Sequence, residues 1–186
     1  MMDELRTERL ILRQWREDDF FPFYQLNSDE KVMAFFPEVL TREQSDECAA
    51  EIQKRIRDNH GWGFWAVEES ASRQFIGFVG LNKPKIEFPF PLEIEIGWRL
   101  DRRYWGNGYA TEAALKSLEY AFDVLSVKEV VAFTSVLNER SMAVMRRLGM
   151  VDTKSNFMHP SVDKSNKLCE HVLYKIVRKQ WEHQIV

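Results

Sequence analysis

One short segment constrains the fold of this chain more than any other: residues 103–113 read RYWGNGYATEA. It follows a strand-like run, contains two closely spaced glycines, and leads into a stretch with apolar residues at helical spacing. The missing side chains of Gly106 and Gly108 let an anionic ligand approach the backbone, and the free N–H groups of a helix start favour phosphate. The segment therefore predicts a strand, a tight turn and a helix. It leaves open whether the turn binds phosphate or is only a compact connection.

Two better-known phosphate-binding motifs do not match this turn. A Walker loop ends in Gly-Lys-Ser/Thr, whereas Gly108 is followed by Tyr109 and Ala110. A dinucleotide-binding fingerprint needs glycine or alanine three residues after its second glycine, and Thr111 occupies that position. Neither a P-loop nor a Rossmann dinucleotide site is therefore predicted.

The rest of the chain alternates between strand-like and helix-like patterns, which predicts a mixed α/β sheet. The expected strands are 9–13, 62–67, 75–81, 92–100, 129–136, 151–158 and 169–177. The expected helices run from Asp18 towards Leu26, from Ser28 to about Phe36, from Thr41 to Gly61, from Gly106 to Phe122 and from Asn138 to Leu148. The unit around the two glycines is expected to be a right-handed crossover joining two parallel strands, 92–100 and 129–136.

Length and charge narrow the class of protein. A chain of 186 residues without a repeat or a Ser/Gly linker predicts one domain over 1–186. The net charge of −3 argues against a general nucleic-acid binder, which needs a basic face. The charged start, Met1 to Arg6, is unlike a signal peptide, and no run approaches the roughly 20 apolar residues that span a bilayer. We therefore expect a cytoplasmic protein with neither nucleic acid nor membrane as a partner.

Cysteine and histidine spacing gives no indication of a metal site. Cys48 and Cys169 lie far apart and are expected to be buried thiols. His159 and His171 lack companions at metal-ligand spacing. No metal is therefore expected in this protein.

Residues 103–113 strongly resemble the acetyl-CoA pyrophosphate loop of the GNAT acetyltransferase superfamily, especially its RimJ/RimL-like branch. The likeness spans about residues 6–182 and includes the segments EIGWRL (95–100), NERS (138–141) and LGM (148–150). It implies the GNAT fold, a central mixed and twisted sheet of about seven strands with about four helices. In that fold the fourth and fifth strands are parallel and splay apart.

The resemblance also implies acetyl-CoA as co-substrate. The pantetheine arm would lie between the splayed strands, along the backbone of Ile96, Trp98 and Leu100, and an N–H near Trp98 would polarise the thioester carbonyl. Backbone N–H groups would hold the pyrophosphate. The implied loop residues are Arg103, Trp105, Gly106, Asn107, Gly108, Tyr109 and Ala110. Asn138 matches a family asparagine that reaches the pantetheine or the acetyl group, although a plain helix cap explains it equally well.

The implied reaction is direct attack of a neutral amine on the thioester. An alkyl amine is only about one part in a thousand neutral at pH 7, which is worth about 4 kcal/mol, so a carboxylate base is expected. Glu95 is the first candidate and Glu93 shares its face; both also fit solvated strand carboxylates. Many GNAT members place a general-acid tyrosine where this chain has Met145. Ser141, which matches a serine of RimL-like members, takes that role here, unless the thiolate leaves unaided.

The sequence thus predicts an acetyl-CoA-dependent N-acetyltransferase, monomeric or homodimeric, that acts on a protein N-terminal α-amine, a polyamine or another small amine. A non-catalytic acyl-CoA-binding module and a transferase for longer acyl groups are the alternatives. Several aromatic residues fit either an acceptor pocket or the core. They are Trp15, Phe35, Phe36, Trp62 and Trp65.

Overall fold

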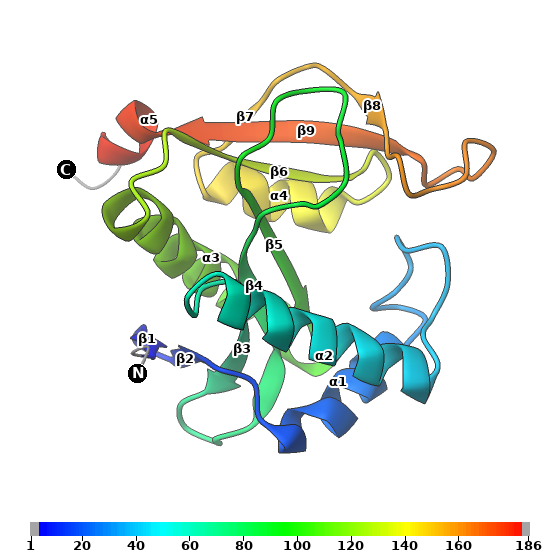
Figure 1. The fold of residues 1–186 in the computed structure, drawn as a ribbon, viewed down its shortest axis with the longest axis vertical. Helices are drawn as coiled ribbons and strands as arrows, with labels where there is room; N and C mark the ends of the chain where they lie inside the picture. Colours follow the sequence, from blue (N-terminus) through cyan, green and yellow to red (C-terminus); the bar gives the residue numbers. More distant parts are fainter. Residues whose placement is uncertain (1–3, 184–186) are drawn as a thin grey trace.

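The computed structural model describes residues 4–183 of the chain. Within that range nine strands form one mixed sheet in the order β1-β2-β3-β4-β5-β6-β9-β7, and β8 pairs with β9 (Figure 1). The strands are β1 Leu5–Arg6, β2 Leu10–Arg13, β3 Phe64–Glu69, β4 Phe75–Asn82, β5 Glu95–Leu100, β6 Glu129–Ser135, β7 Val151–Asp152, β8 Phe157–Met158 and β9 Glu170–Val177.

The helices begin and end at local signals that the sequence carries. They are α1 Phe20–Asn27, α2 Arg42–Asp58, α3 Tyr109–Glu119, α4 Glu139–Arg147 and α5 Arg178–Glu182, with single turns η1 Glu17–Asp19, η2 Arg102–Tyr104 and η3 Tyr120–Val124. Thr41 and Gln44 form the expected capping box at α2. The Asn138 side chain caps α4, and Gly149 has the left-handed φ of 73° that stops it.

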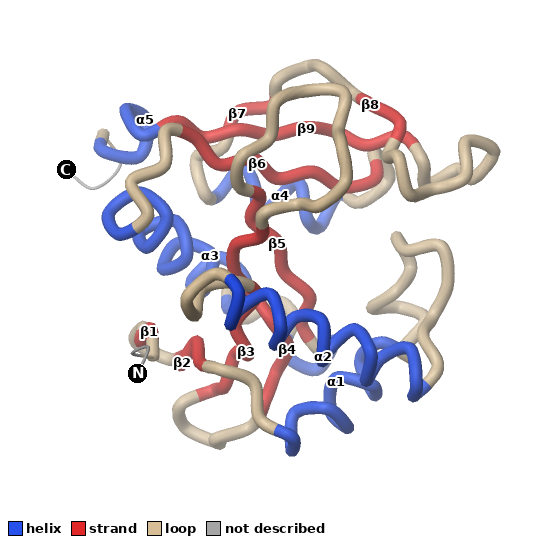
Figure 2. The backbone as a smooth tube through the Cα atoms, in the orientation of Figure 1, coloured by secondary structure: helices blue, strands red, loops and turns tan. Residues whose placement is uncertain are grey.

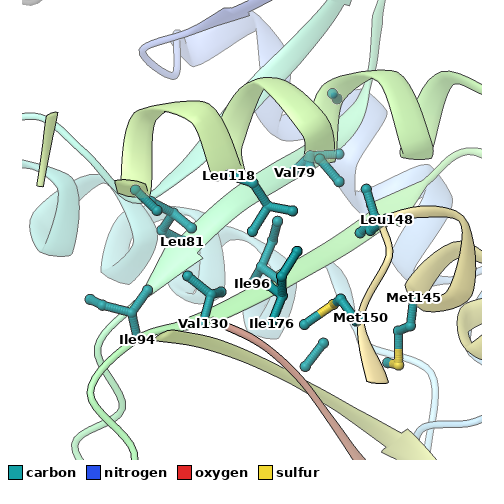
Figure 3. Close-up of a cluster of buried hydrophobic side chains, with 14 of the residues drawn as sticks. Val79, Leu81, Ile94, Ile96, Leu118, Val130, Met145, Leu148, Met150 and Ile176 are labelled. Carbon is teal, nitrogen blue, oxygen red and sulfur yellow. The ribbon is translucent and has the colours of Figure 1, made fainter. Parts of the chain in front are cut away.

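The helices cover both faces of the sheet (Figure 2). Neighbouring residues of β3 point to opposite faces, and Ala66 packs in one hydrophobic cluster with α1 and α2 while Trp65 and Val67 pack in another. The second cluster is the larger, and it joins α3 and α4 to the sheet. Figure 3 shows part of it, where Leu118 of α3 and Met145 of α4 contribute buried side chains. Strands β3 and β4 are therefore packed on both faces by helices, while part of β6 and β9 packs with the loop between β4 and β5.

The two central parallel strands separate almost as soon as they meet. Strands β5 and β6 pair at a single residue pair, Glu95 with Val131. There the Val131 N–H donates to the Ile94 carbonyl at 3.1 Å. By contrast, β5 pairs with β4 along its whole length, from Glu95 to Leu100. The expected mixed sheet with splayed parallel neighbours is confirmed.

Two sequence-based boundaries are wrong for local reasons. The short helix expected from Ser28 is a series of turns: the Asp29 carboxylate accepts the N–H groups of Lys31 and Val32 and caps one helical turn, closed by the Met33 N–H on the Asp29 carbonyl, which does not continue as a helix. The strand expected over 92–100 begins only at Glu95. Glu93 therefore lies outside it, and its side chain is exposed.

The remaining differences concern short elements. The strand expected over 151–158 is two strands, β7 and β8, and the pieces β1 and α5 were not expected. Two-residue strands and a five-residue helix carry too few residues to show a periodicity. Among the helices of residues 4–183, none has the length and apolarity needed to cross a membrane.

Candidate active site

A cleft of about 2420 Å³ runs along the edge where β5 and β6 part. Its walls come from β5, the two-glycine turn (Gly106 to Gly108), the first turn of α4 and the loop between α1 and α2. Every residue that the sequence proposed for coenzyme binding lines this cleft except Arg103. The fold thus brings together side chains that are more than 40 positions apart in the chain.

The two-glycine turn presents bare backbone to the cleft. Gly106 and Gly108 both have φ of 80°, a left-handed conformation that residues with a Cβ rarely adopt. A Cβ built on Gly106 would meet no atom of the described residues within 4 Å, so the turn is open on that side. At the start of α3, no side chain in the described part of the chain caps the helix, and Glu112 is the first N–H to bond back, to the Gly108 carbonyl. The preceding N–H groups are therefore free to bind an anion.

The positive charge beside this turn is not the one that the sequence indicated. The Arg103 guanidinium pairs with Asp101 at 2.6 Å and is 70% exposed, outside the cleft. Arg140 instead lines the cleft, and its guanidinium lies 4.5 Å from the ring centre of Trp105. Arg140 lies in the first turn of α4, directly after the Asn138 cap. Because the sequence already placed Asn138 in the coenzyme site, Arg140 could have been predicted to lie there too.

The edge of β5 offers unpaired backbone groups to the cleft. Because Ile94 directs its carbonyl towards β6, the alternate residues Ile96 and Trp98 direct their backbone groups to the same side. The ladder has already ended at Trp98, and at Leu100 the carbonyl accepts the Trp105 indole N–H at 2.9 Å. An extended ligand can therefore pair with β5 at Trp98 as an additional strand would.

Glu95 sits at the point of divergence and is the one strongly perturbed carboxyl among the described cleft residues. Burial raises its pKa to about 7, against the opposing effects of a hydrogen bond from Asn82 and the charge of Arg55. Asn82 Nδ2 donates to Glu95 Oε1 at 2.6 Å, and the Asn82 amide oxygen accepts from Arg55 at 3.1 Å. Sequence reasoning missed Asn82, which pairs with Glu95 in the β4–β5 register. Glu93, the second candidate base, does not line the cleft.

Asn138 holds both a helix end and a cluster of hydroxyl groups. Its Oδ1 accepts the Ser141 N–H at 3.3 Å, while its Nδ2 donates to Thr134 Oγ1 at 2.9 Å and to Ser141 Oγ at 3.2 Å. The Ser141 oxygen therefore acts as an acceptor towards Asn138, which leaves its own proton available to a ligand in the cleft. Met145 lines the same cleft but is 2% exposed and has no proton to donate.

The aromatic candidates divide between the cleft and the core. Phe35 and Phe36 line the cleft. Trp15 and Trp65 are buried core residues, and Trp62 packs half-buried against the larger cluster.

The two histidines face one another in the cleft. The ring centres of His159 and His171 are 4.9 Å apart, and burial lowers the pKa of both, for His159 to about 4. They are therefore neutral at pH 7. Across residues 4–183, no group of three or more His, Cys, Asp or Glu side chains is arranged to hold a metal ion.

Comparison with known proteins agrees with this geometry. The family model described as Acetyltransferase (GNAT) domain matches residues 9–151. The uncharacterized N-acetyltransferase YnaD of Bacillus subtilis is 28% identical over 95% of this chain and 98% of its own length. The FsC-acetyl coenzyme A-N(2)-transacetylase of Aspergillus fumigatus is 28% identical over 84% of this chain and 68% of its own.

Solved structures share the fold. The acetyltransferase (GNAT family) from Bacillus anthracis superimposes with a TM-score of 0.78 at 23% identity, covering 95% of this chain and 99% of that one. The splayed strands, the open two-glycine turn and the family match over most of the chain point the same way. The chain belongs to the GNAT family of acetyl-CoA-dependent N-acetyltransferases.

Proposed function

We propose that this chain, as one domain, transfers the acetyl group of acetyl-CoA directly to a primary amine, with Glu95 as the base. The acceptor is a small amine or a protein N-terminal α-amine. The observation that carries the proposal is a buried carboxyl with a pKa of about 7 placed where β5 and β6 part. A general base works best when its pKa lies near the operating pH.

The donor would be held mainly by backbone groups. The N–H groups at the start of α3 would bind the diphosphate, and Arg140 would neutralise part of its charge. The free edge of β5 at Trp98 would pair with the pantetheine amides and direct an N–H towards the thioester carbonyl. Backbone contacts suit this donor because they recognise its linear, amide-rich arm without demanding particular side chains.

The chemical step uses a proton acceptor on β5 and a proton donor on α4. Glu95 takes a proton from the amine, directly or through one water, as the new C–N bond forms. The C–S bond then breaks and the thiolate leaves. Ser141 can supply a proton to the sulfur because its oxygen is fixed by Asn138. Since a thiol pKa is near 8.5, the thiolate leaves readily in any case, and the loss of Ser141 costs less than the loss of Glu95.

An amine and acyl-CoA screen tests the proposed function. Free thiol is measured with a panel of primary amines, and the mass of each product is checked for one added acetyl group. Amine-dependent thiol release supports an enzyme, and replacing acetyl-CoA with longer acyl-CoA esters tests the donor preference. Tight acetyl-CoA binding without turnover on any amine or N-terminal peptide would instead identify a non-catalytic acyl-CoA-binding module.

The pH dependence of kcat/KM should show the raised pKa of Glu95. Below pH 7 the carboxyl is protonated and cannot accept a proton, so kcat/KM should fall by about tenfold per pH unit below its pKa of about 7. The profile is measured with two acceptors whose amine pKa values differ by about two units. A limb near pH 7 that stays in place for both acceptors belongs to the enzyme. A limb that moves with the acceptor would contradict the assignment to Glu95.

Bulky replacement of the two turn glycines should abolish tight coenzyme binding. In Gly106→Val/Gly108→Val, both β-branched side chains must adopt a left-handed φ. The side chain at position 106 enters the open space beside the free N–H groups, and a Cβ at position 108 lies 3.6 Å from Arg9 Nη2. We expect the Kd for CoA to rise at least tenfold, or about 1.4 kcal/mol, in calorimetry.

A matched control separates backbone strain from the loss of the ligand site. Gly149 has a similar φ of 73° but ends α4 outside this cleft. Gly149→Ala is therefore expected to lower thermal stability without changing CoA affinity. Unchanged affinity in the Gly106→Val/Gly108→Val protein would refute the proposed diphosphate site.

A further inference from the structure

The cleft contains a second charged group on β5, Arg99, to which the proposed acetyl transfer assigns no role. Arg99 shares a face of the strand with Glu95 and Gly97, because alternate residues of a strand point the same way. This is the face covered by α1 and α2, opposite the face that packs on α3. Arg99 and Glu95 are four residues apart, or about 13 Å along the strand. Gly97 lies between them without a side chain to separate the two.

Neutral groups fix the position of the Arg99 guanidinium. Its Nη1 donates to Asn27 Oδ1 at 2.6 Å, and the Asn27 amide in turn donates to Ser45 Oγ at 3.0 Å. Asn27 and Ser45 are both 0% exposed. On the other side, the guanidinium carbon lies 4.1 Å from the ring centre of Phe36, which also lines the cleft. The group is thus held in place by a buried network and an aromatic face.

No carboxylate of the described residues forms an ion pair with this guanidinium. Its Nε is fully buried and has no hydrogen-bond partner within residues 4–183. Burial lowers the pKa of Arg99 to about 10, so the group stays charged at neutral pH. The contrast with Arg13 is direct: that arginine is 5% exposed and is met by two buried carboxylates, Asp19 and Glu68.

Arg99 is half-buried, with its Nε fully buried, and a partly desolvated cation without a counter-charge is costly, so that proteins usually neutralise it with a partner. Neutral groups support Arg99, its buried Nε has no acceptor within residues 4–183, and the side chain lines the cleft. An arginine guanidinium presents its N–H groups in a planar fork that matches a carboxylate. The partner missing from the described residues is therefore expected to arrive with the acceptor.

We propose that the acceptor is a small primary amine that carries a carboxylate, and that Arg99 binds this carboxylate while the amine faces Glu95. This inference rests on the proposed acetyl transfer and narrows its acceptor class. It disfavours polyamines, whose second ammonium group would lie against the guanidinium. Arg99 acts here on specificity, since it is far along the strand from the base.

Acceptors matched in length test the assignment. Amino acids and ω-amino acids of increasing chain length are compared with their carboxamides and with diamines of the same length. For the best pair, kcat/KM should favour the carboxylate by roughly 30- to 1000-fold over its carboxamide, mostly through KM. In Arg99→Met this preference should fall to less than about threefold, while the carboxamide is used almost as before. Arg99→Lys should recover part of the preference, since it restores charge without the planar fork.

A binding measurement keeps the inference testable without turnover. Calorimetry of the CoA-bound protein with the carboxylate and its carboxamide should show the same preference, and Arg99→Met should remove it. The melting temperature of the Met variant checks that it folds, because the change removes a charge but also leaves the buried Asn27 Oδ1 without its donor. Equal binding of carboxylate and carboxamide, or a preference for diamines, would overturn the inference. Acetyl transfer to those other amines would leave the proposed function intact.

Discussion

Replacing Glu95 with glutamine is expected to lower kcat by about 10²- to 10⁴-fold, the usual contribution of a positioned general base. Glutamine has nearly the same shape and keeps an oxygen that can accept the 2.6 Å hydrogen bond from Asn82. The local structure should therefore persist while the proton acceptor is lost. Steady-state kinetics at saturating acetyl-CoA measures the effect, and the limb near pH 7 should disappear from the residual activity.

Glu93→Gln is the matched control for this experiment. It removes a neighbouring carboxylate that is exposed and lies outside the cleft, so kcat should change by less than about twofold. CoA affinity should be equal in both variants and the native protein, because neither change touches the two-glycine turn. A Glu95→Gln enzyme that retains full kcat would show that another group, or bulk water, accepts the proton.

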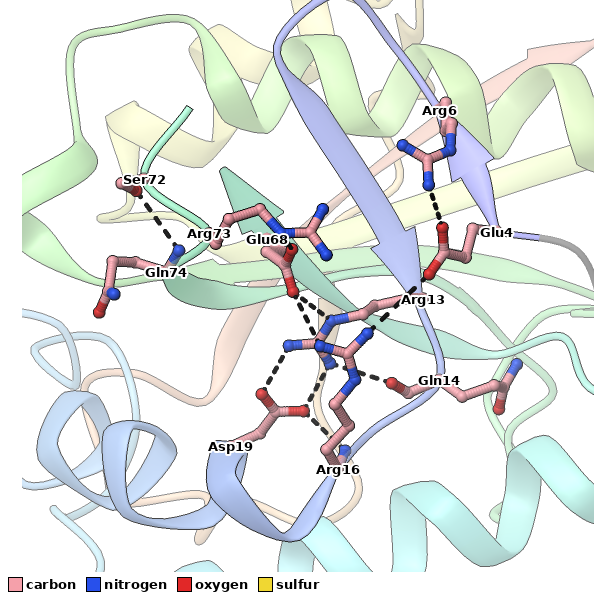
Figure 4. Close-up of polar contacts among 10 residues, drawn as sticks. All are labelled: Glu4, Arg6, Arg13, Gln14, Arg16, Asp19, Glu68, Ser72, Arg73 and Gln74. Atoms are coloured by element: carbon pink, nitrogen blue, oxygen red, sulfur yellow. Dashed lines mark hydrogen bonds and ion pairs between the residues drawn. The ribbon is translucent and has the colours of Figure 1, made fainter. Parts of the chain in front are cut away.

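Replacing Arg13 with methionine is expected to cost about 3–5 kcal/mol of unfolding free energy, the usual penalty for breaking a buried ion pair. Figure 4 shows the network that this arginine holds together. Arg13 donates to Asp19 at 2.7 and 2.8 Å and to Glu68 at 2.7 Å, and all three side chains are almost fully buried. For a protein of this size, the loss corresponds to a melting temperature lower by about 6–20 °C.

The cost should arise mainly from the Asp19 carboxylate left behind rather than from the lost arginine itself, because Glu68 keeps its ion pairs with Arg16 and Arg73. Adding Asp19→Asn to Arg13→Met should therefore restore part of the stability. Arg42→Met is the exposed control, since Arg42 is 40% exposed in its ion pair with Asp46, and its loss should cost less than about 1 kcal/mol. Equal melting temperatures for the Arg13→Met and Arg42→Met proteins would contradict the proposed role of the buried network.

The sequence was most informative where structure depends on local signals. The glycines of the turn, the capping box at Thr41 and Gln44, and the stop at Gly149 each act within a few residues. They placed the main helices correctly. Family resemblance then supplied the arrangement of the sheet, including the separation of β5 and β6, which no periodicity reveals.

The sequence was least informative where a property depends on tertiary contacts. Glu93 and Glu95 look equivalent in the sequence, yet one is exposed and the other is half-buried and bonded to Asn82. Arg103 looked like a phosphate ligand, but Asp101 two residues earlier engages it. The unpaired state of Arg99 could not be read from the chain, because it depends on which residues of α1 and α2 lie opposite β5.

The meeting of β5 and β6 at one residue pair has a consequence for how the molecule responds to its donor. Beyond that pair, β5 and β6 share no backbone pairing, and the two parts of the sheet are joined mainly by side chains that pack with α3. A coenzyme arm lying between β5 and β6 would bridge the two strands and link the two parts of the sheet while it is bound. The bound coenzyme would also form one wall of the site for the incoming amine. This favours an ordered cycle in which acetyl-CoA binds first and CoA dissociates last.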